Sequence, residues 1–121
     1  MTSAWRTGRR GETMAAWWLR LKGYAILARG YSLGRGRGTG EVDIIAKRGR
    51  TLVFVEVKAR ADMQSAAQAI RRRQRLRIER AAAAFLAHRP DLAACAIRFD
   101  AVLLVPGRWP CHICDAWRMD A

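Results

Sequence analysis

Long apolar runs are absent from this sequence of 121 residues. No stretch approaches the roughly 20 residues that a membrane-spanning helix needs, and the opening letters, MTSAWRTGRRGETMAAWW, lack the continuous apolar segment of a signal peptide. We therefore expect a soluble, cytoplasmic protein with no membrane partner. A chain of this length fits one domain that buries roughly two-thirds of its unfolded surface, so we expect residues 1–121 to form a single domain.

Cysteine is also scarce, with Cys95, Cys111 and Cys114 the only three. Three cysteines cannot all pair, and an odd count without an export signal favours reduced thiols over a disulfide framework. The tetrapeptide Cys111-His112-Ile113-Cys114 offers three soft or borderline metal ligands. One such motif without a second ligand pair is weak evidence for zinc, so coincidence is the favoured interpretation.

Acidic residues number only 10 against 23 lysines and arginines, which gives a formal net charge of +13. Such a chain repels itself unless it works beside a polyanion, and nucleic acid is the commonest such partner. Only Lys22, Lys47 and Lys58 are lysines. A lysine in so arginine-rich a background is weakly indicative of chemistry that needs an amine.

Hydrophobic periodicity and glycine positions predict six elements. These are a helix at about 9–22, strands at 24–33, 41–47, 51–58 and 96–105, and a long helix at about 63–88. The long helix carries a stripe of Ala67, Ile70, Gln74, Ile78, Ala81 and Phe85 at spacings of three and four. The order predicts an α/β fold, with a mixed central sheet of about four or five strands flanked by helices. The core spans about residues 8–105, followed by a C-terminal tail at 106–121.

Two acidic residues are predicted to face each other across the hairpin formed by the second and third strands. A two-residue turn at Gly49-Arg50 fixes the register, because such turns favour glycine first. The predicted pairs are Arg48 with Thr51, Asp43 with Glu56, and Glu41 with Lys58. Since side chains alternate along a strand, the acidic residues and Lys58 share one face of the sheet.

Opposed carboxylates repel each other unless a cation lies between them, and Mg²⁺ is the natural occupant. Its hard oxygen ligands would be Asp43, Glu56 and the backbone carbonyl of Val57. Lys58 would orient the attacking water or stabilise charge on the phosphorane, which makes the set suitable for metal-assisted phosphodiester hydrolysis. The alternative is an ordinary hairpin with a solvated face, on which Glu41 and Lys58 form a surface ion pair.

The motifs GEVDIIA, LVFVEVKAR and RFDAVLL also carry a family resemblance. Asp43 followed by Glu56-Val57-Lys58 resembles the PD-(D/E)xK nuclease superfamily, with Val42 in place of the proline, and residues 8–105 look like the YraN-like family of small bacterial proteins. The resemblance implies a restriction-endonuclease-like core and a DNA endonuclease related to Holliday junction resolvases, with Mg²⁺ or Mn²⁺ as cofactor. It implies that Asp43 and Glu56 are metal ligands and that Lys58 is the catalytic lysine.

Three further residues are possible members of this site. Glu12 matches the helical acid of resolvase-like members, although an acid in a first helical turn is also favoured by the helix dipole alone. Glu41 either extends the acidic cluster or pairs with Lys58, and the pairing is slightly favoured. Gln74 resembles the site glutamine of some nucleases in the superfamily, but an exposed edge of the helical stripe is the favoured interpretation.

Arginines are expected to contact DNA phosphates. On the long helix they are Arg71, Arg72, Arg73, Arg75, Arg77 and Arg80, and in the glycine-rich loop they are Arg35 and Arg37. A solvated helix face is the alternative for the first group, but six arginines offset only by Glu79 favour phosphate contact. The competing function is a non-catalytic nucleic-acid-binding module of the same fold. A resolvase-like role would favour a homodimer.

Trp17 and Trp18 are adjacent on a helix, so both cannot face the core, and partial burial is favoured over base stacking.

Overall fold

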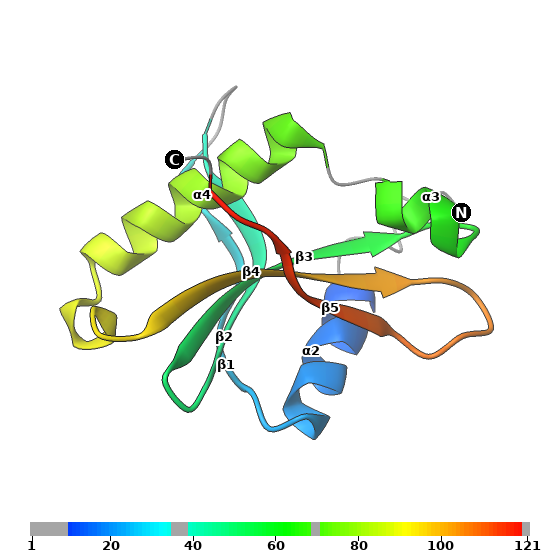
Figure 1. Ribbon diagram of the computed structural model, residues 1–121, viewed down its shortest axis with the longest axis horizontal. Helices are drawn as coiled ribbons and strands as arrows, with labels where there is room; N and C mark the ends of the chain where they lie inside the picture. The colour runs from blue at the N-terminus through cyan, green and yellow to red at the C-terminus, as the bar shows by residue number, and fades with distance from the viewer. Residues whose placement is uncertain (1–9, 35–38, 69–70, 120–121) are drawn as a thin grey trace.

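The computed structural model describes residues 10–34, 39–68 and 71–119. Its centre is a five-stranded sheet in the order β1-β2-β3-β4-β5, with helices on both faces (Figure 1). The predicted α/β fold with a mixed sheet flanked by helices is therefore confirmed. Across the described part of the chain, every helix is too short or too polar to cross a membrane.

The elements follow the predicted order, with one additional strand. They are α2 (Gly11–Leu21), β1 (Ala25–Ser32), β2 (Glu41–Arg48), β3 (Thr51–Ala59), α3 (Met63–Gln68), α4 (Arg72–Ala87), the short 3₁₀ helix η2 (Pro90–Leu92), β4 (Ala96–Leu104) and β5 (Cys111–Trp117). Strands β3 and β4 are parallel, whereas all other neighbouring strands are antiparallel. Parallel pairing brings the carboxyl ends of β3 and β4 to the same edge of the sheet.

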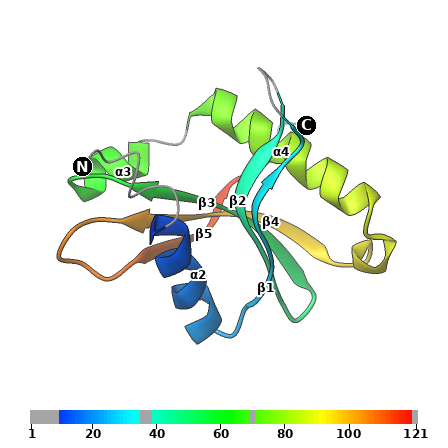
Figure 2. The ribbon, with the colours of Figure 1, turned by 180° about the vertical axis from the view of Figure 1, so that it is seen from behind.

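The β2–β3 hairpin has the predicted register near its turn. Arg48 pairs with Thr51, and the pairing continues to Ile44 with Val55. Gly49 has φ of 61°, which the two-residue turn requires and which glycine adopts without strain. The recorded pairing ends at Ile44, while β2 stays paired with β1 as far as Glu41. The two strands consequently diverge beyond this point (Figure 2).

Helices α2 and α4 cover opposite faces of the sheet, and Figure 2 shows α2 in front of β4 and β5. On the α4 face, Ile78 and Phe85 pack with Phe54 of β3. On the α2 face, Leu19 packs in a separate cluster with Val53 of β3. Each face of β3 is therefore buried under a different helix, as alternating side chains on a two-sided sheet require.

Gly40 marks the closest approach of α4 to the sheet. A Cβ atom at this position would lie 2.6 Å from the backbone nitrogen of Ala81 and 3.0 Å from the carbonyl oxygen of Arg77. Only glycine therefore allows the start of β2 to pack directly against the α4 backbone. This contact holds the middle of α4 beside the start of β2, where Glu41 and Asp43 lie.

The predicted helix at 63–88 is wrong as a single element, because the structure divides it into α3 and α4. Arg71 is extended, with φ of −96° and ψ of 163°, and it precedes α4 as its N-cap. An extended residue cannot continue the helical hydrogen-bond ladder, so α4 begins at Arg72. Within the predicted stripe, Ile78, Ala81 and Phe85 are buried as expected, whereas Ile70 lies outside the described residues.

Strand β5 lies in the segment 106–121 that the sequence suggested was a tail. It pairs antiparallel with β4 through Ala101 with Ile113 and Phe99 with Trp117. A separation of two residues on β4 is thus matched by a separation of four residues on β5. This irregularity breaks the alternation of side chains by which strands are recognised in a sequence. The stacked rings of Phe99 and Trp117, 5.4 Å apart, anchor the strand to the core.

Candidate active site

Asp43 lies where β2 separates from β3. Its Oδ2 atom accepts a hydrogen bond of 2.8 Å from the backbone N–H of Val57. The carboxylate therefore takes the place of a backbone partner beyond the last recorded strand pair, Ile44 with Val55. This bond fixes the side chain of Asp43 against β3, one residue from Glu56.

Glu56 is the more unusual of the two acids, because its side chain is buried on β3 with only 5% exposure. Burial, a hydrogen bond with Asp43 and the charge of Asp43 together raise the pKa of Glu56 to about 10, against the lowering effect of Lys58. In the metal-free protein Glu56 is consequently protonated at neutral pH. The predicted pair of acids is thus brought together, with a proton between them.

Glu12 reaches the same place from α2. It shares the sheet-facing side of this helix with Ala16 and Leu19, both fully buried. Burial raises the pKa of Glu12, and the negative charge of Asp43 raises it further, while Arg29 opposes both. The first turn of α2 therefore brings a third carboxyl group into the field of Asp43.

Glu41 does not lie opposite Lys58, so the predicted pairing is wrong. Its carboxylate forms an ion pair of 2.9 Å with Arg77 of α4, because β2 leaves β3 before reaching this residue. The charge of Glu41 still raises the pKa of both Glu12 and Glu56. Asp43 and the exposed Glu41 therefore act on both Glu12 and Glu56.

The remaining predicted site residues flank these acids. Lys58 is partly buried on β3, and its positive charge lowers the pKa of Glu56. Val57, between them, is 2% exposed and donates its N–H to Asp43. Gln74 is partly buried in the first turn of α4, and its participation stays a prediction.

The donor set fits the cation that the family resemblance implies. Asp43 and Glu56, together with the carbonyl of Val57, offer only oxygen atoms, which are the ligands of Mg²⁺ and Mn²⁺, whereas Glu12 is not within 4.8 Å of both acids among the described residues. A cation that binds Asp43 and Glu56 must displace the proton of Glu56, because carboxyl groups bind metal in their deprotonated form. The arrangement is suitable for charge neutralisation at a phosphodiester by a metal and one amine.

A second polar cluster, which the sequence did not predict, lies at the other end of α2. Asp100 of β4 is fully buried. Each of its two carboxylate oxygens accepts two hydrogen bonds. On Oδ1 the donors are Arg98 Nε at 2.8 Å and the Asp115 N–H at 3.0 Å, and on Oδ2 they are Arg98 Nη2 at 2.8 Å and His112 Nε2 at 2.7 Å. Burial alone would raise the pKa of Asp100, but these bonds lower it to about 2.

This cluster brings Asp100, His112 and Cys114 within 4.8 Å of one another, which is the spacing of metal ligands. The carboxylate has no lone pair left for a cation, because the four bonds occupy all of them. The ammonium of Lys22 lies 2.6 Å from His112 Nδ1 and can only donate. His112 must then carry its proton on Nε2, so this nitrogen cannot bind a metal either. We assign the cluster a structural role that joins α2, β4 and β5.

The predicted DNA-contacting arginines of the long helix cluster around the start of α4. Arg71, Arg72, Arg73 and Arg75 are all exposed, and Arg75 lies with its guanidinium carbon 5.9 Å from the centre of the Trp117 ring. Arg77, one turn further along, joins this end of α4 to the acidic site through Glu41. Arg35 and Arg37 lie outside the described residues.

Comparison with known proteins identifies the family. Residues 11–104 match the model described as Uncharacterised protein family UPF0102. Over 118 residues the chain is 58% identical to UPF0102 protein amb4503 of Paramagnetospirillum magneticum, covering 98% of this chain and 92% of that protein. It is 49% identical over 116 residues to a UPF0102 protein of Parvibaculum lavamentivorans, covering 96% of this chain and 84% of that one. The chain therefore belongs to the UPF0102 family, the YraN-like family that its sequence motifs resemble.

Proposed function

We propose that this protein is a metal-dependent nuclease that hydrolyses DNA phosphodiester bonds. The observation that carries the proposal is the buried Glu56 beside Asp43, with the amine of Lys58 two residues further along the same strand. A buried carboxyl group with so raised a pKa costs stability at neutral pH, and such costs are typical of functional sites. The resemblance to PD-(D/E)xK nucleases supports the same roles.

In the proposed mechanism, Asp43, Glu56 and the Val57 carbonyl would hold Mg²⁺ or Mn²⁺, and Glu12 would support Asp43 from α2. The bound cation supplies Lewis-acid polarisation of the phosphodiester and a lower pKa for a water molecule. Lys58 positions the attacking water or stabilises the negative charge that develops on the phosphoryl oxygens. The Val57 N–H keeps Asp43 in its orientation, so the chain provides a preorganised site.

DNA is the proposed substrate because the chain carries a net charge of +13 and exposes arginines on α4, the helix that contacts the acidic site through Arg77 and Glu41. Phosphate contacts by such arginines supply affinity without sequence preference. An endonuclease that cuts branched DNA on two strands needs two sites, so we further propose a homodimer for this activity.

The test is cleavage of labelled linear, single-stranded and four-way-junction DNA by purified protein, with Mn²⁺ or with EDTA. We expect cleavage only with Mn²⁺ and its loss in Lys58→Ala. The matched control is Lys47→Ala, which removes a partly buried lysine of β2 that pairs with Leu52 near the hairpin turn. Absence of Mn²⁺-dependent cleavage of every substrate by the wild type would contradict the proposal.

The second candidate is a nucleic-acid-binding module without turnover. It is favoured by the arginines around the start of α4, which need no acidic site to bind phosphates. In this case Lys58→Ala and the wild type would bind DNA equally, and neither would cut it.

A further inference from the structure

A pocket of about 590 Å³ is lined by residues that directly adjoin Glu12 and Lys58 in the sequence. Its walls come from the start of α2, the end of β3 and the turn after β4, three segments that are far apart in the sequence. Each wall contributes one arginine, and these are Arg10, Arg60 and Arg108. The backbone N–H of Arg60 donates to Leu104 and that of Arg108 to Val105, at 3.1 and 3.2 Å, so two of the walls are hydrogen-bonded.

The pocket continues the proposed site along two elements. Arg10 precedes Glu12 by two residues at the start of α2, and Arg60 follows Lys58 by two residues at the end of β3. The carboxyl ends of parallel strands are where α/β sheets bind ligands, and β3 and β4 both end here. Three arginines in such a place are suited to a phosphate group.

An exposed apolar surface borders this pocket. Met14, Trp17 and Leu21 form one stripe of α2 on the side away from the sheet, with exposures of 52%, 52% and 62%. Trp109, directly after Arg108, is 75% exposed and stacks on Trp18 with ring centres 5.7 Å apart. Met14 also lines the pocket itself, so the exposed apolar surface of α2 reaches the pocket that holds the three arginines.

We propose that this surface binds an unpaired DNA strand next to the bond that is cut. Phosphates of the strand lie in the pocket of Arg10, Arg60 and Arg108, and one or more bases stack on Trp109 and Trp17. This inference rests on the proposed nuclease function and adds the substrate class, which is DNA with a single-stranded segment, such as a flap or a branch.

Two other occupants of this surface can be compared with an unpaired strand, namely duplex DNA and a second copy of this chain. In a duplex the bases stack on one another, whereas an unpaired strand presents them to aromatic side chains. A second copy of this chain would bury the aromatic stripe but would bring its own +13 charge against the three arginines. A polyanion with aromatic bases matches both parts of the surface, and a protein of like charge matches only the apolar part.

The experiment measures binding in EDTA, so it is independent of cleavage. Fluorescence anisotropy would compare a labelled oligonucleotide of about 12 thymidines with a duplex of equal length. We expect Trp109→Ala to weaken single-strand binding about tenfold, because stacking on an aromatic residue is lost, and to leave duplex binding unchanged. Trp109→Phe should restore most of the affinity, and Trp109 is exposed enough for these changes to leave the fold intact.

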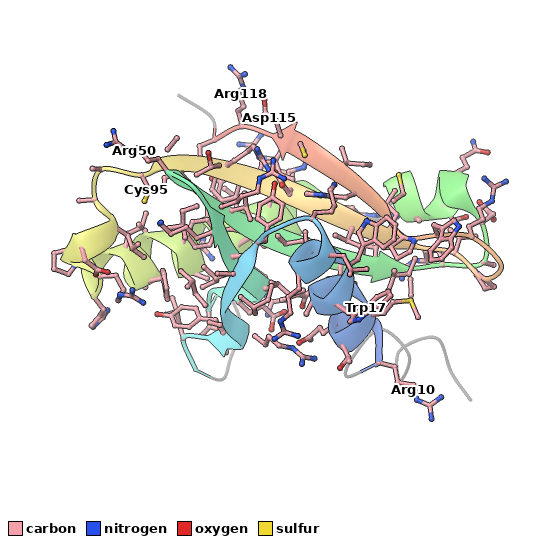
Figure 3. All side chains as sticks on the ribbon, turned by 90° about the horizontal axis from the view of Figure 1, so that it is seen from below. Arg10, Trp17, Arg50, Cys95, Asp115 and Arg118 are labelled. Carbon is pink, nitrogen blue, oxygen red and sulfur yellow. The ribbon has the colours of Figure 1, made fainter. Side chains whose placement is uncertain are left out.

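Arginine variants test the pocket with a matched control. Arg108→Ala should lower the slope of log affinity against log salt for the single strand by about 0.7. Arg118→Ala removes an exposed arginine, which Figure 3 shows on the side of the molecule opposite Arg10 and Trp17, and it should change single-strand affinity less than twofold. Equal losses for both arginines would overturn the assignment of the pocket.

Two results would overturn the proposal as a whole. One is a Trp109→Ala variant that binds single strands as well as the wild type does, or that loses duplex binding equally. The other is a wild-type dimer that dissociates in Trp109→Ala during sedimentation, which would assign the surface to a second copy. Selective loss of single-strand binding without any Mn²⁺-dependent cleavage would support this surface and contradict only the nuclease function.

Discussion

At the scale of the residue, Glu56 makes the strongest departure from ordinary behaviour. The side chain carries its proton far above the usual range because it is buried beside Asp43. Below pH 4.5 the folded and unfolded chains both hold this proton. As the pH rises from 4.5 towards 10, the unfolded chain loses it and the folded chain keeps it, so stability falls across this interval.

Glu56→Gln should therefore stabilise the metal-free protein at pH 8. Glutamine is neutral at every pH and fills nearly the same space, so we expect the free energy of unfolding to rise by about 1–3 kcal/mol in EDTA. The difference from the wild type should shrink as the pH is lowered and vanish below pH 4.5. Urea unfolding at several pH values measures it.

The control is Glu79→Gln, which changes a partly buried acid of α4 outside the site, and an equal gain in both variants would show that the effect is not specific to Glu56. A Glu56→Gln variant less stable than the wild type at pH 8 would show that Glu56 is charged and paired in the metal-free protein.

The sequence pattern predicted the approach of Asp43 to Glu56, but it did not predict the partner of Glu41 or the buried Asp100. The glycine-first turn determined the register of the hairpin, and alternation then placed Asp43 near Glu56. The departure of β2 from β3 is not encoded in that local pattern, so the partner of Glu41 was predicted as Lys58 when it is Arg77. Asp100 was missed because its donors include residues of β5, which the sequence did not reveal.

At the scale of the element, α4 joins the site to the basic surface. Gly40 lets the helix lie directly on the start of β2, and Arg77 then reaches Glu41. The break before α4 leaves Arg71 extended as its N-cap, with Arg72 and Arg73 in the first turn. Arg71, Arg72, Arg73 and Arg75 are therefore gathered at the N-terminal end of α4.

Replacing Arg71, Arg72 and Arg73 together by alanine should weaken binding to all duplex sequences alike. Each arginine that binds a phosphate releases counterions, so the slope of log affinity against log salt should flatten by about 0.9 for each phosphate that is no longer neutralised. Titrations of two unrelated duplexes at several salt concentrations in EDTA measure both effects. Arg89→Ala, at the opposite end of α4, is the control, and an unchanged slope in the triple variant would remove this helix end from the interface.

At the scale of the whole molecule, the sequence predicted the layers better than it predicted their edges. The strongly apolar strands and the apolar stripes of α2 and α4 predicted a mixed sheet between helices, because a sheet that is buried on both faces needs a helix layer on each. The fifth strand was missed since its irregular pairing with β4 hides the period of two. The helix break was missed because the apolar stripe keeps its spacing of three and four residues across it.

Metal binding should appear as a property of the whole fold. A cation that binds only the folded state stabilises it by mass action, by about 2.7 kcal/mol at 100 times its Kd. Its binding must expel the proton of Glu56, so the rise in Tm with millimolar Mn²⁺ should be larger at pH 8 than at pH 6. Asp43→Asn should abolish the rise at both pH values. Asp91→Asn, which alters an exposed acid paired with Arg89, should keep it, and an equal rise in the two variants would place the bound cation outside the site of Asp43 and Glu56.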